Sequence, residues 1–217
     1  MSLQAVLLDL DGTLIDTAPD MVAALNQLLL EQGAAPAPYA VARNQVSNGA
    51  AGLLRMGLGP QAATDVRLRQ RYLDIYAERL CTNSFIFNGL QSLFELIYNT
   101  GLSWGVVTNK PAWLTEPLLA QLNPQPTPGC IVSGDTLPER KPHPAPLQLA
   151  AETLGIPPLD CIYVGDSARD IQAGRAAGMR TIAAAYGYIL PGEDIQAWQA
   201  DFTIRRPEHL AQHIAGL

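Results

Sequence analysis

The sequence of 217 residues predicts an α/β fold with three layers, in which helices cover both faces of a parallel sheet. Two observations carry this prediction. Short apolar runs typical of buried strands alternate with segments of helical periodicity. The alternation stops directly after the first strand, where residues 17–87 contain no convincing strand pattern. We therefore expect a core domain of residues 1–16 and 88–217 and an inserted helical cap domain of residues 17–87.

The first strand is expected over residues 5–8 and runs into two aspartates. An apolar run bounded by a turn signal is typical of a strand buried in a parallel sheet. Asp9 and Asp11 follow it two positions apart, which places their side chains on the same side of the strand. Carboxylates held so close repel each other unless a cation or a proton donor is present. A capping role would explain Asp11 but not Asp9, so the pair indicates a functional site.

The inserted segment carries two helical patterns, one near residues 19–31 and one of mixed charge near residues 62–80. The stretch 47–52 lies between them and is rich in small residues. We expect the chain to return to the core at the Asn88–Gly89 pair.

Four more strands are expected, at residues 102–107, 129–132, 161–164 and 181–184. Helical patterns separate them, and several end at a glycine or before a proline. In parallel sheets of this kind, ligands bind outside the carboxyl ends of the strands. The residues that follow each strand are therefore the first candidates for a site.

Composition excludes several classes of protein. The net charge of −6 argues against nucleic acid or an anionic membrane as the main partner, and no apolar run reaches membrane-spanning length. The first residues lack the features of a secretory signal, so we expect a cytoplasmic protein that is a monomer or a homodimer. Cys81, Cys130 and Cys161 are odd in number and widely spaced, which fits neither a disulfide framework nor a zinc site.

Three of the predicted strands end in polar residues whose side chains can take part in catalysis or metal binding. Asp9 and Asp11 end the first, Thr108 the second and Asp166 the fourth. Three converging carboxylates would repel one another, and Mg²⁺ suits a site of a few carboxylates plus substrate phosphate.

Lys141, in the loop before a predicted helix, would add a compact positive charge. Thr108 would add a hydroxyl, and backbone N–H groups of residues 10–13 would form a concavity that binds anions. An acidic metal site beside a phosphate-sized pocket is what phosphoryl transfer needs.

Four segments of the chain, 9–13, 108–109, 141–142 and 165–170, resemble the four motifs of the haloacid dehalogenase-like hydrolase superfamily, in the family's order. The resemblance implies a Rossmann-like core with a cap of the C1 type. Residues 16–20, 107–111 and 185–188 are similar to phosphoglycolate phosphatases. Residues 186–189, with Trp198 and the Ala200–Asp201 pair, look more like the related N-acetylmuramic acid 6-phosphate phosphatases.

The resemblance also implies a mechanism. Asp9 would attack phosphorus and form an aspartyl-phosphate, and Asp11 would protonate the leaving alcohol and then activate water. Mg²⁺ would bind Asp9, the backbone carbonyl of Asp11 and Asp166. Thr108 and Lys141 would hold the phosphoryl oxygens.

Other residues would support the site or bind the substrate, a small phosphorylated metabolite. Asp170, beside Ser167, would orient Lys141 or a metal-bound water. The expected substrate contacts are Thr13 and Asn109 of the core and Arg43, Asn48, Gly49 and Arg55 of the cap.

Alternatives within the superfamily differ in what they need from these residues. A dehalogenase needs neither Mg²⁺ nor a leaving-group acid, so Asp11 argues against it. A phosphonatase uses a cap lysine, and residues 17–87 contain none. A sugar phosphomutase of the β-phosphoglucomutase type stays open. From another class, a phospho-aspartate receiver switch has its acceptor on a middle strand of an uninterrupted domain, which does not fit here.

Overall fold

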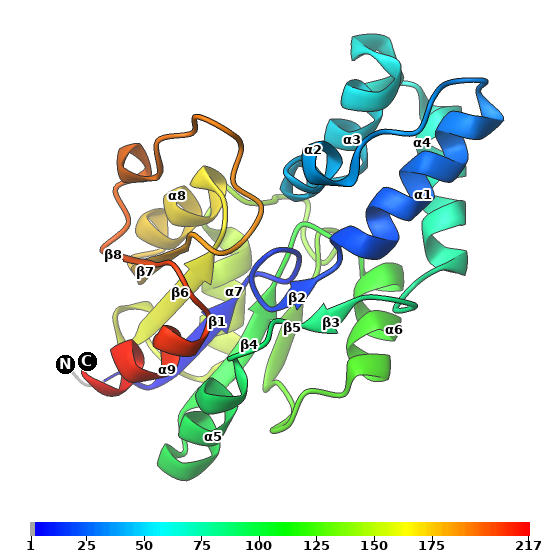
Figure 1. Ribbon diagram of the computed structural model, residues 1–217. Coiled ribbons are helices and arrows are strands. Elements are labelled where there is room, and N and C mark those ends of the chain that lie inside the picture. Colours follow the sequence, from blue (N-terminus) through cyan, green and yellow to red (C-terminus); the bar gives the residue numbers. More distant parts are fainter. Residues whose placement is uncertain (1–2) are drawn as a thin grey trace.

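The computed structural model describes residues 3–217 and contains a parallel sheet with a helical segment above it (Figure 1). The sheet has six strands in the order β5-β4-β1-β6-β7-β8, and every neighbouring pair is parallel. The strands are β1 (Ala5–Leu8), β4 (Ser103–Val107), β5 (Cys130–Val132), β6 (Cys161–Gly165), β7 (Arg180–Ala184) and β8 (Phe202–Ile204). The α/β fold predicted from the sequence is confirmed.

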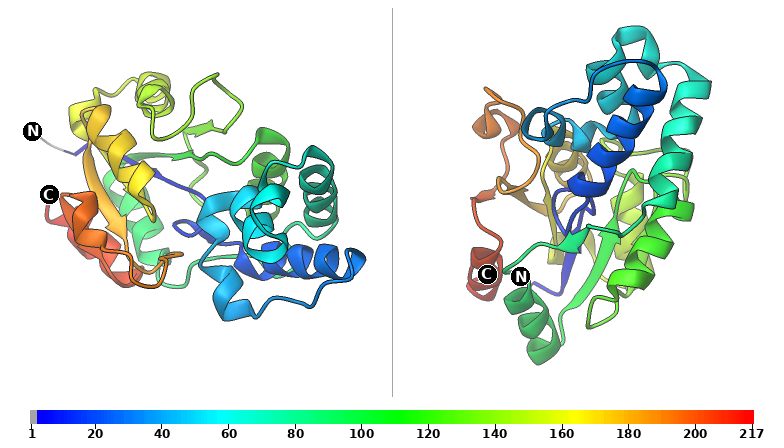
Figure 2. Two further views of the ribbon diagram at one scale, coloured as in Figure 1. Left: turned by 90° about the horizontal axis from the view of Figure 1, so that it is seen from above. Right: turned by 45° about the vertical axis from the view of Figure 1, so that its right-hand side comes forward.

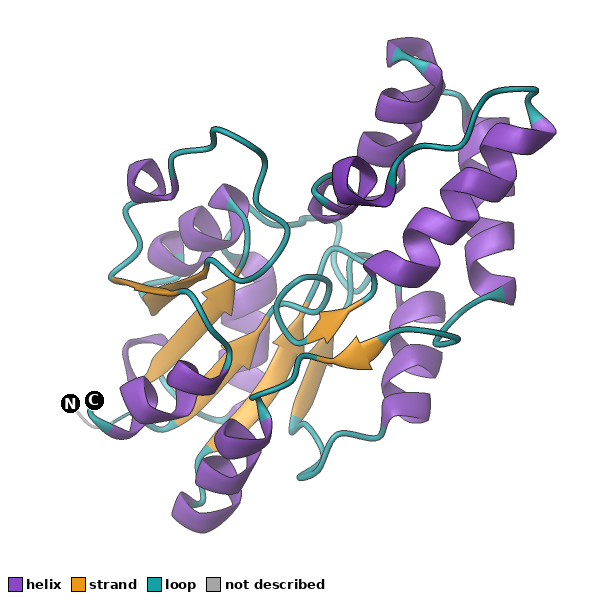
Figure 3. Ribbon diagram, viewed as in Figure 1, coloured by secondary structure: helices purple, strands orange, loops and turns teal. Residues whose placement is uncertain are grey.

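Both faces of the sheet are covered, as Figure 3 shows by element type. Val6 and Leu8 belong to the core cluster that includes helices α5 (Gln91–Thr100) and α9 (Glu208–Ala215). Ala5 and Leu7 belong to the opposite cluster, with α7 (Ala145–Leu154) and part of α8 (Ala168–Ala176). Because strand side chains alternate between faces, β1 has to be apolar at every position.

The inserted segment forms four α-helices, which the views of Figure 2 place over the carboxyl ends of the strands. They are α1 (Ala18–Glu31), α2 (Tyr39–Arg43), α3 (Gly49–Leu58) and α4 (Val66–Glu78), with short 3-10 turns at Val46–Asn48 and Pro60–Ala63. Their apolar sides pack together, and Leu114 of α6 (Ala112–Leu122) and Tyr188 join this cluster from the core. We call this segment, residues 17–87, the cap.

Three elements differ from the sequence-based expectation. The cap segment contains a two-residue strand, β3 (Phe85–Ile86), which pairs antiparallel with β2 (Ile15–Asp16) where the chain leaves and re-enters the core. The region around residues 47–52 is helical, as the start of α3. The edge strand β8 was not expected, because three residues are too few for a strand pattern to be recognised.

The strand order positions the site. β1 lies between β4 and β6, and residues after these three strands therefore meet at one edge of the sheet. Asp9 donates its backbone N–H to Val164 of β6 at 2.9 Å, and Thr108 donates to Val132 of β5 at the same distance. The ladder thus continues one residue past each strand end and holds these two positions rigidly.

Candidate active site

Lys141 is a buried cation of the site, beside Asp9. Its Nζ lies 2.8 Å from Asp9 Oδ1 and 2.8 Å from Asp170 Oδ1. It also donates to the Val107 carbonyl at 2.9 Å and to the Tyr163 hydroxyl at 2.7 Å. Burial lowers the pKa of Lys141, but the carboxylates of Asp170 and Asp9 outweigh burial and leave that pKa above its usual value. Lys141 is therefore a fixed positive charge beside Asp9.

Asn109 fixes the backbone of Lys141. Its Oδ1 accepts from the Lys141 N–H at 3.1 Å, and its Nδ2 donates to the Lys141 carbonyl at 3.0 Å. Asn109 also lines the cavity described below. The residue after Thr108 thus ties the second strand end to the lysine loop.

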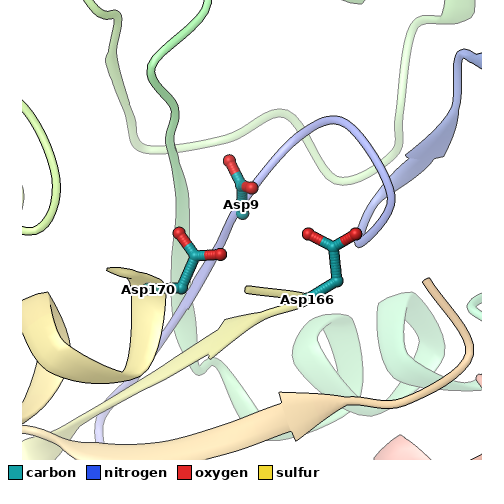
Figure 4. Close-up of side chains that lie close together, drawn as sticks. All are labelled: Asp9, Asp166 and Asp170. Carbon is teal, nitrogen blue, oxygen red and sulfur yellow. The ribbon is translucent and has the colours of Figure 1, made fainter. Parts of the chain in front are cut away.

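A cluster of three carboxylates lies at the strand ends, shown in Figure 4. One oxygen each of Asp9, Asp166 and Asp170 lies within 4.8 Å of the others, and all three residues are buried. Burial raises the pKa of Asp9 to about 6, with Lys141 opposing it. Burial, reinforced by the carboxylates of Asp9 and Asp170, raises the pKa of Asp166 to about 8. The cluster carries more negative charge than Lys141 neutralises.

Asp166 has the properties of a metal ligand. Its Oδ2 accepts from Tyr188 N at 2.8 Å, whereas its buried Oδ1 has no hydrogen-bond partner within residues 3–217. Gly12 and Gly187 leave the space beside this carboxylate, since a Cβ at either position would collide with it. A buried oxygen without a partner, in a cluster of acidic oxygens, fits a hard cation such as Mg²⁺.

Asp170 and Ser167 support the lysine. Asp170 Oδ2 accepts from the Ser167 hydroxyl at 2.5 Å and from the Ser167 backbone N–H at 3.0 Å, which fixes the start of α8. Burial raises the pKa of Asp170, but the charges of Lys141 and Arg169, with hydrogen bonds from Lys141 and Ser167, together outweigh burial and leave that pKa below its usual value. This carboxylate is therefore ionised and holds Lys141 in place.

The sequence predicted that Asp11 would converge with Asp9 and Asp166, but Asp170 is the third member of the cluster. The carboxylate of Asp11 is not part of the three-carboxylate cluster. Instead its Oδ1 accepts from Thr17 Oγ1 at 2.6 Å and from Lys110 Nζ at 3.0 Å. The repulsion between the two aspartates of the first motif is relieved by two different lysines, Lys141 for Asp9 and Lys110 for Asp11. Metal binding through the backbone carbonyl of Asp11, as the resemblance implies, stays a prediction.

A cavity of about 220 Å³ lies between the strand ends and the cap. Asp9, Asp11, Thr108 and Lys141 line its floor, and Asn48 and Gly49 at the start of α3 line its roof.

Three expected substrate contacts lie outside the lining of this cavity. Arg55 is exposed on α3, beyond the first turn that faces the cavity. The Thr13 hydroxyl is buried without a partner within residues 3–217, and it is not part of the cavity wall. Arg43 is engaged elsewhere: it donates to the Gly187 carbonyl at 3.2 Å and lies 3.6 Å from Asp16. The structure does not bring these three side chains to the cavity, and substrate binding by them stays a prediction.

Several residues of the wall were missing from the sequence-based set. They are Ser47, Arg69, Tyr72, Tyr76, Lys110 and Arg169. Lys110 had a signal, because it follows Thr108 and Asn109 at a strand end. The residues on α4 had none, because a polar residue on a charged helix looks the same whether it faces solvent or a cavity.

Comparison with known proteins assigns the chain to a family. The model of the haloacid dehalogenase-like hydrolases matches residues 6–184. The chain belongs to this family. No described helix is both long enough and apolar enough to cross a membrane.

Relatives and solved structures in this family cover nearly the whole chain. A phosphoglycolate phosphatase of Xanthomonas campestris pv. campestris is 42% identical over 95% of this chain and 94% of that protein. An N-acetylmuramic acid 6-phosphate phosphatase of Pseudomonas aeruginosa is 39% identical over 97% and 94%. A crystal structure described as a "predicted phosphoglycolate phosphatase" from Haemophilus somnus has a TM-score of 0.85 and 26% identity, and the match covers 98% of both chains.

Proposed function

We propose that this hydrolase is a Mg²⁺-dependent phosphatase that cleaves a small phosphomonoester through an aspartyl-phosphate on Asp9. The observation that carries the proposal is the position of the Asp9 carboxylate. It lines the cavity, its Oδ1 lies 2.8 Å from Lys141 Nζ, and it belongs to the carboxylate cluster with Asp166 and Asp170. Relatives named as phosphatases, at about 40% identity, support phosphomonoester hydrolysis.

Asp9 is the nucleophile in this proposal. Its carboxylate attacks phosphorus, and the bond between phosphorus and the ester oxygen breaks in line with the attack. Thr108 and Lys141 bind phosphoryl oxygens, so charge that builds up on them meets a hydroxyl and an ammonium already in place. Asp9, Asp166 and the Asp11 carbonyl would hold Mg²⁺, which when bound neutralises phosphate charge beside the nucleophile.

Asp11 moves the proton. It gives a proton to the leaving oxygen and afterwards takes one from the water that hydrolyses the aspartyl-phosphate. The Thr17 hydroxyl, 2.6 Å away, fixes the orientation of this carboxylate. The cap covers the cavity and keeps other water out during the first step.

The substrate and the compartment belong to the proposal as well. We expect the substrate to be 2-phosphoglycolate or N-acetylmuramic acid 6-phosphate, because relatives named as phosphatases of these compounds match 95% and 97% of this chain. All three cysteines are free thiols, which supports a reducing, cytoplasmic location.

The test is a phosphate-release assay with and without Mg²⁺, on both candidate substrates and on common sugar phosphates. Asp9→Asn removes the nucleophile, and we expect turnover to fall by at least about 1,000-fold while Mg²⁺ still binds. Asp135→Asn is the matched control: Asp135 is exposed, and its side chain accepts a hydrogen bond from Ala112 N at 2.8 Å, which an amide oxygen can also accept. Activity retained in Asp9→Asn contradicts the proposal, and phosphate transferred to a sugar rather than water indicates a mutase.

A further inference from the structure

Lys110 is a buried lysine of the cavity that the proposed mechanism does not use. Its side chain is only 4% exposed. Nζ lies 3.0 Å from Asp11 Oδ1 and 2.9 Å from the Tyr76 hydroxyl, and it sits 4.5 Å from the centroid of the Tyr76 ring. A buried ammonium is costly unless its charge and its hydrogen bonds are satisfied. The contacts with Asp11 and Tyr76 offset this cost and keep the charge of Lys110 in the cavity.

The Lys110 ammonium has hydrogen-bonding capacity to spare. An ammonium group has three N–H donors, and within residues 3–217 Asp11 and Tyr76 are the two acceptors that its Nζ contacts. Lys110 also lines the cavity. Its third donor is thus available to a ligand bound there, and an anionic acceptor would form the strongest such bond.

The position of Lys110 indicates which part of a bound substrate its ammonium group would contact. The transferred phosphoryl group is served by Thr108 and Lys141 on the Asp9 side. Lys110 instead contacts Asp11, which under the proposed function reaches the leaving oxygen. A group bound by Lys110 therefore belongs to the leaving alcohol, close to the ester oxygen.

We infer that Lys110 selects the substrate by binding a carboxylate attached to the carbon that bears the phosphate ester, with Tyr76 as its positioning residue. The inference rests on the proposed function and narrows its substrate class. The carboxylate of 2-phosphoglycolate is attached in this way. The carboxylate of N-acetylmuramic acid 6-phosphate lies across the sugar ring from its phosphate, too far from the ester oxygen for the same contact.

Tyr76 connects this contact to the cap. It belongs to α4, whereas Lys110 belongs to the core, so their contact forms only when the cap covers the site. Burial, with the carboxylate of Asp11 adding to it, raises the pKa of Tyr76 well above its usual value. The phenol is therefore neutral and accepts from Lys110 without cancelling its charge.

The experiment compares two substrates that differ only at this carboxylate, 2-phosphoglycolate and ethyl phosphate, with Mg²⁺ present. Wild-type kcat/KM is expected to favour 2-phosphoglycolate strongly. Lys110→Met keeps the length of the side chain but removes its charge, and we expect the ratio of the two kcat/KM values to fall by about 100-fold. Lys110→Arg should restore part of the ratio. Tyr76→Phe should lower the ratio about tenfold, mainly by raising KM for 2-phosphoglycolate.

Each outcome decides the inference separately from the proposed function. If Lys110→Met lowers both substrates by the same factor, Lys110 only orients Asp11 and the inference is wrong. It is also wrong if the wild-type protein prefers ethyl phosphate or N-acetylmuramic acid 6-phosphate. If wild-type protein releases phosphate from no ester, the proposed function itself fails. Should Lys110→Met not fold, inhibition of the wild-type protein decides: glycolate is expected to compete with substrate, and equal inhibition by ethanol overturns the inference.

Discussion

The Ser47 hydroxyl of the cap donates a hydrogen bond of 2.7 Å to Oδ2 of Asp166, a carboxylate of the candidate metal site. Arg169, which follows Asp166 by three residues, donates to the Ser47 carbonyl in return. One cap residue thus touches the core through both its side chain and its backbone. This contact therefore links the closed position of the cap directly to the candidate metal site.

Ser47→Ala removes the side-chain half of this contact. One hydrogen bond to a charged group contributes about 1.5–3 kcal/mol, so we expect kcat/KM to fall about 10- to 150-fold because the closed cap is less favoured. Steady-state kinetics at saturating Mg²⁺ measure the effect. Ser92→Ala is the control, because the Ser92 hydroxyl donates to the Gly89 carbonyl within the core domain and, in residues 3–217, makes no hydrogen bond with the cap. An unchanged kcat/KM in Ser47→Ala would show that the contact does not contribute to closure.

The acidic cluster makes stability depend on pH in the absence of metal. The pKa values of Asp9 and Asp166 rise in the folded protein to about 6 and about 8, from ordinary values of 3.8. The folded state then binds protons more tightly than the unfolded state. The stability that this proton binding contributes is lost as the pH rises from about 4 to 8. We expect the melting temperature in EDTA to fall over this range.

Added Mg²⁺ should reverse that trend, because the metal binds deprotonated carboxylates and competes with protons for them. The increase in melting temperature on adding Mg²⁺ is expected to grow from pH 5 to pH 8. Asp166→Asn serves as the matched variant and should show a flatter pH dependence and little response to Mg²⁺. A melting temperature in EDTA that rises toward pH 8 would contradict this account of the cluster.

The chemical floor of the site was largely predictable from the sequence, and its roof was not. Asp9, Thr108 and Asp166 each follow a strand, so the strand order alone brings them together. Asp11 shows the limit even there, because its partner Lys110 is set by how the chain turns after β4. On the cap, Arg55 and Arg69 look alike in the sequence. Which of them faces the cavity depends on how α3 and α4 pack, and the periodicity of either helix does not determine that packing.

Tyr188 connects the cap to the core through a single hydroxyl. Its oxygen donates to Asp16 Oδ1 at 2.8 Å and accepts from the backbone N–H groups of Thr17 and Ala18, at 2.8 and 3.0 Å. Tyr188→Phe leaves these buried groups without that partner, and we expect the free energy of unfolding to fall by about 1–3 kcal/mol. Urea denaturation measures it. Tyr98→Phe, at a largely exposed tyrosine, should change the stability by less than about 0.5 kcal/mol.

Two arginines of the cap, Arg69 and Arg55, differ in that Arg69 belongs to the cavity wall and Arg55 does not. Arg69 lines the cavity, and within the described chain no ion pair or hydrogen bond engages its side chain. Arg55, on α3, is exposed as Arg69 is, but it lies outside the lining. Because an arginine in the wall attracts an anionic substrate, Arg69→Ala is expected to raise KM for the preferred phosphomonoester about three- to tenfold, with kcat changing less.

Arg55→Ala removes the same charge from the surface and should leave both constants within about twofold, since a distant exposed charge is screened by salt. Repeating the pair at high salt separates the two roles further. The effect of Arg69→Ala should persist in part, because salt screens a direct contact with the substrate less than it screens a distant charge. If the two variants raise KM equally, and salt abolishes both effects, the arginines act only through the overall field of the cap, and Arg69 makes no direct contact with the substrate.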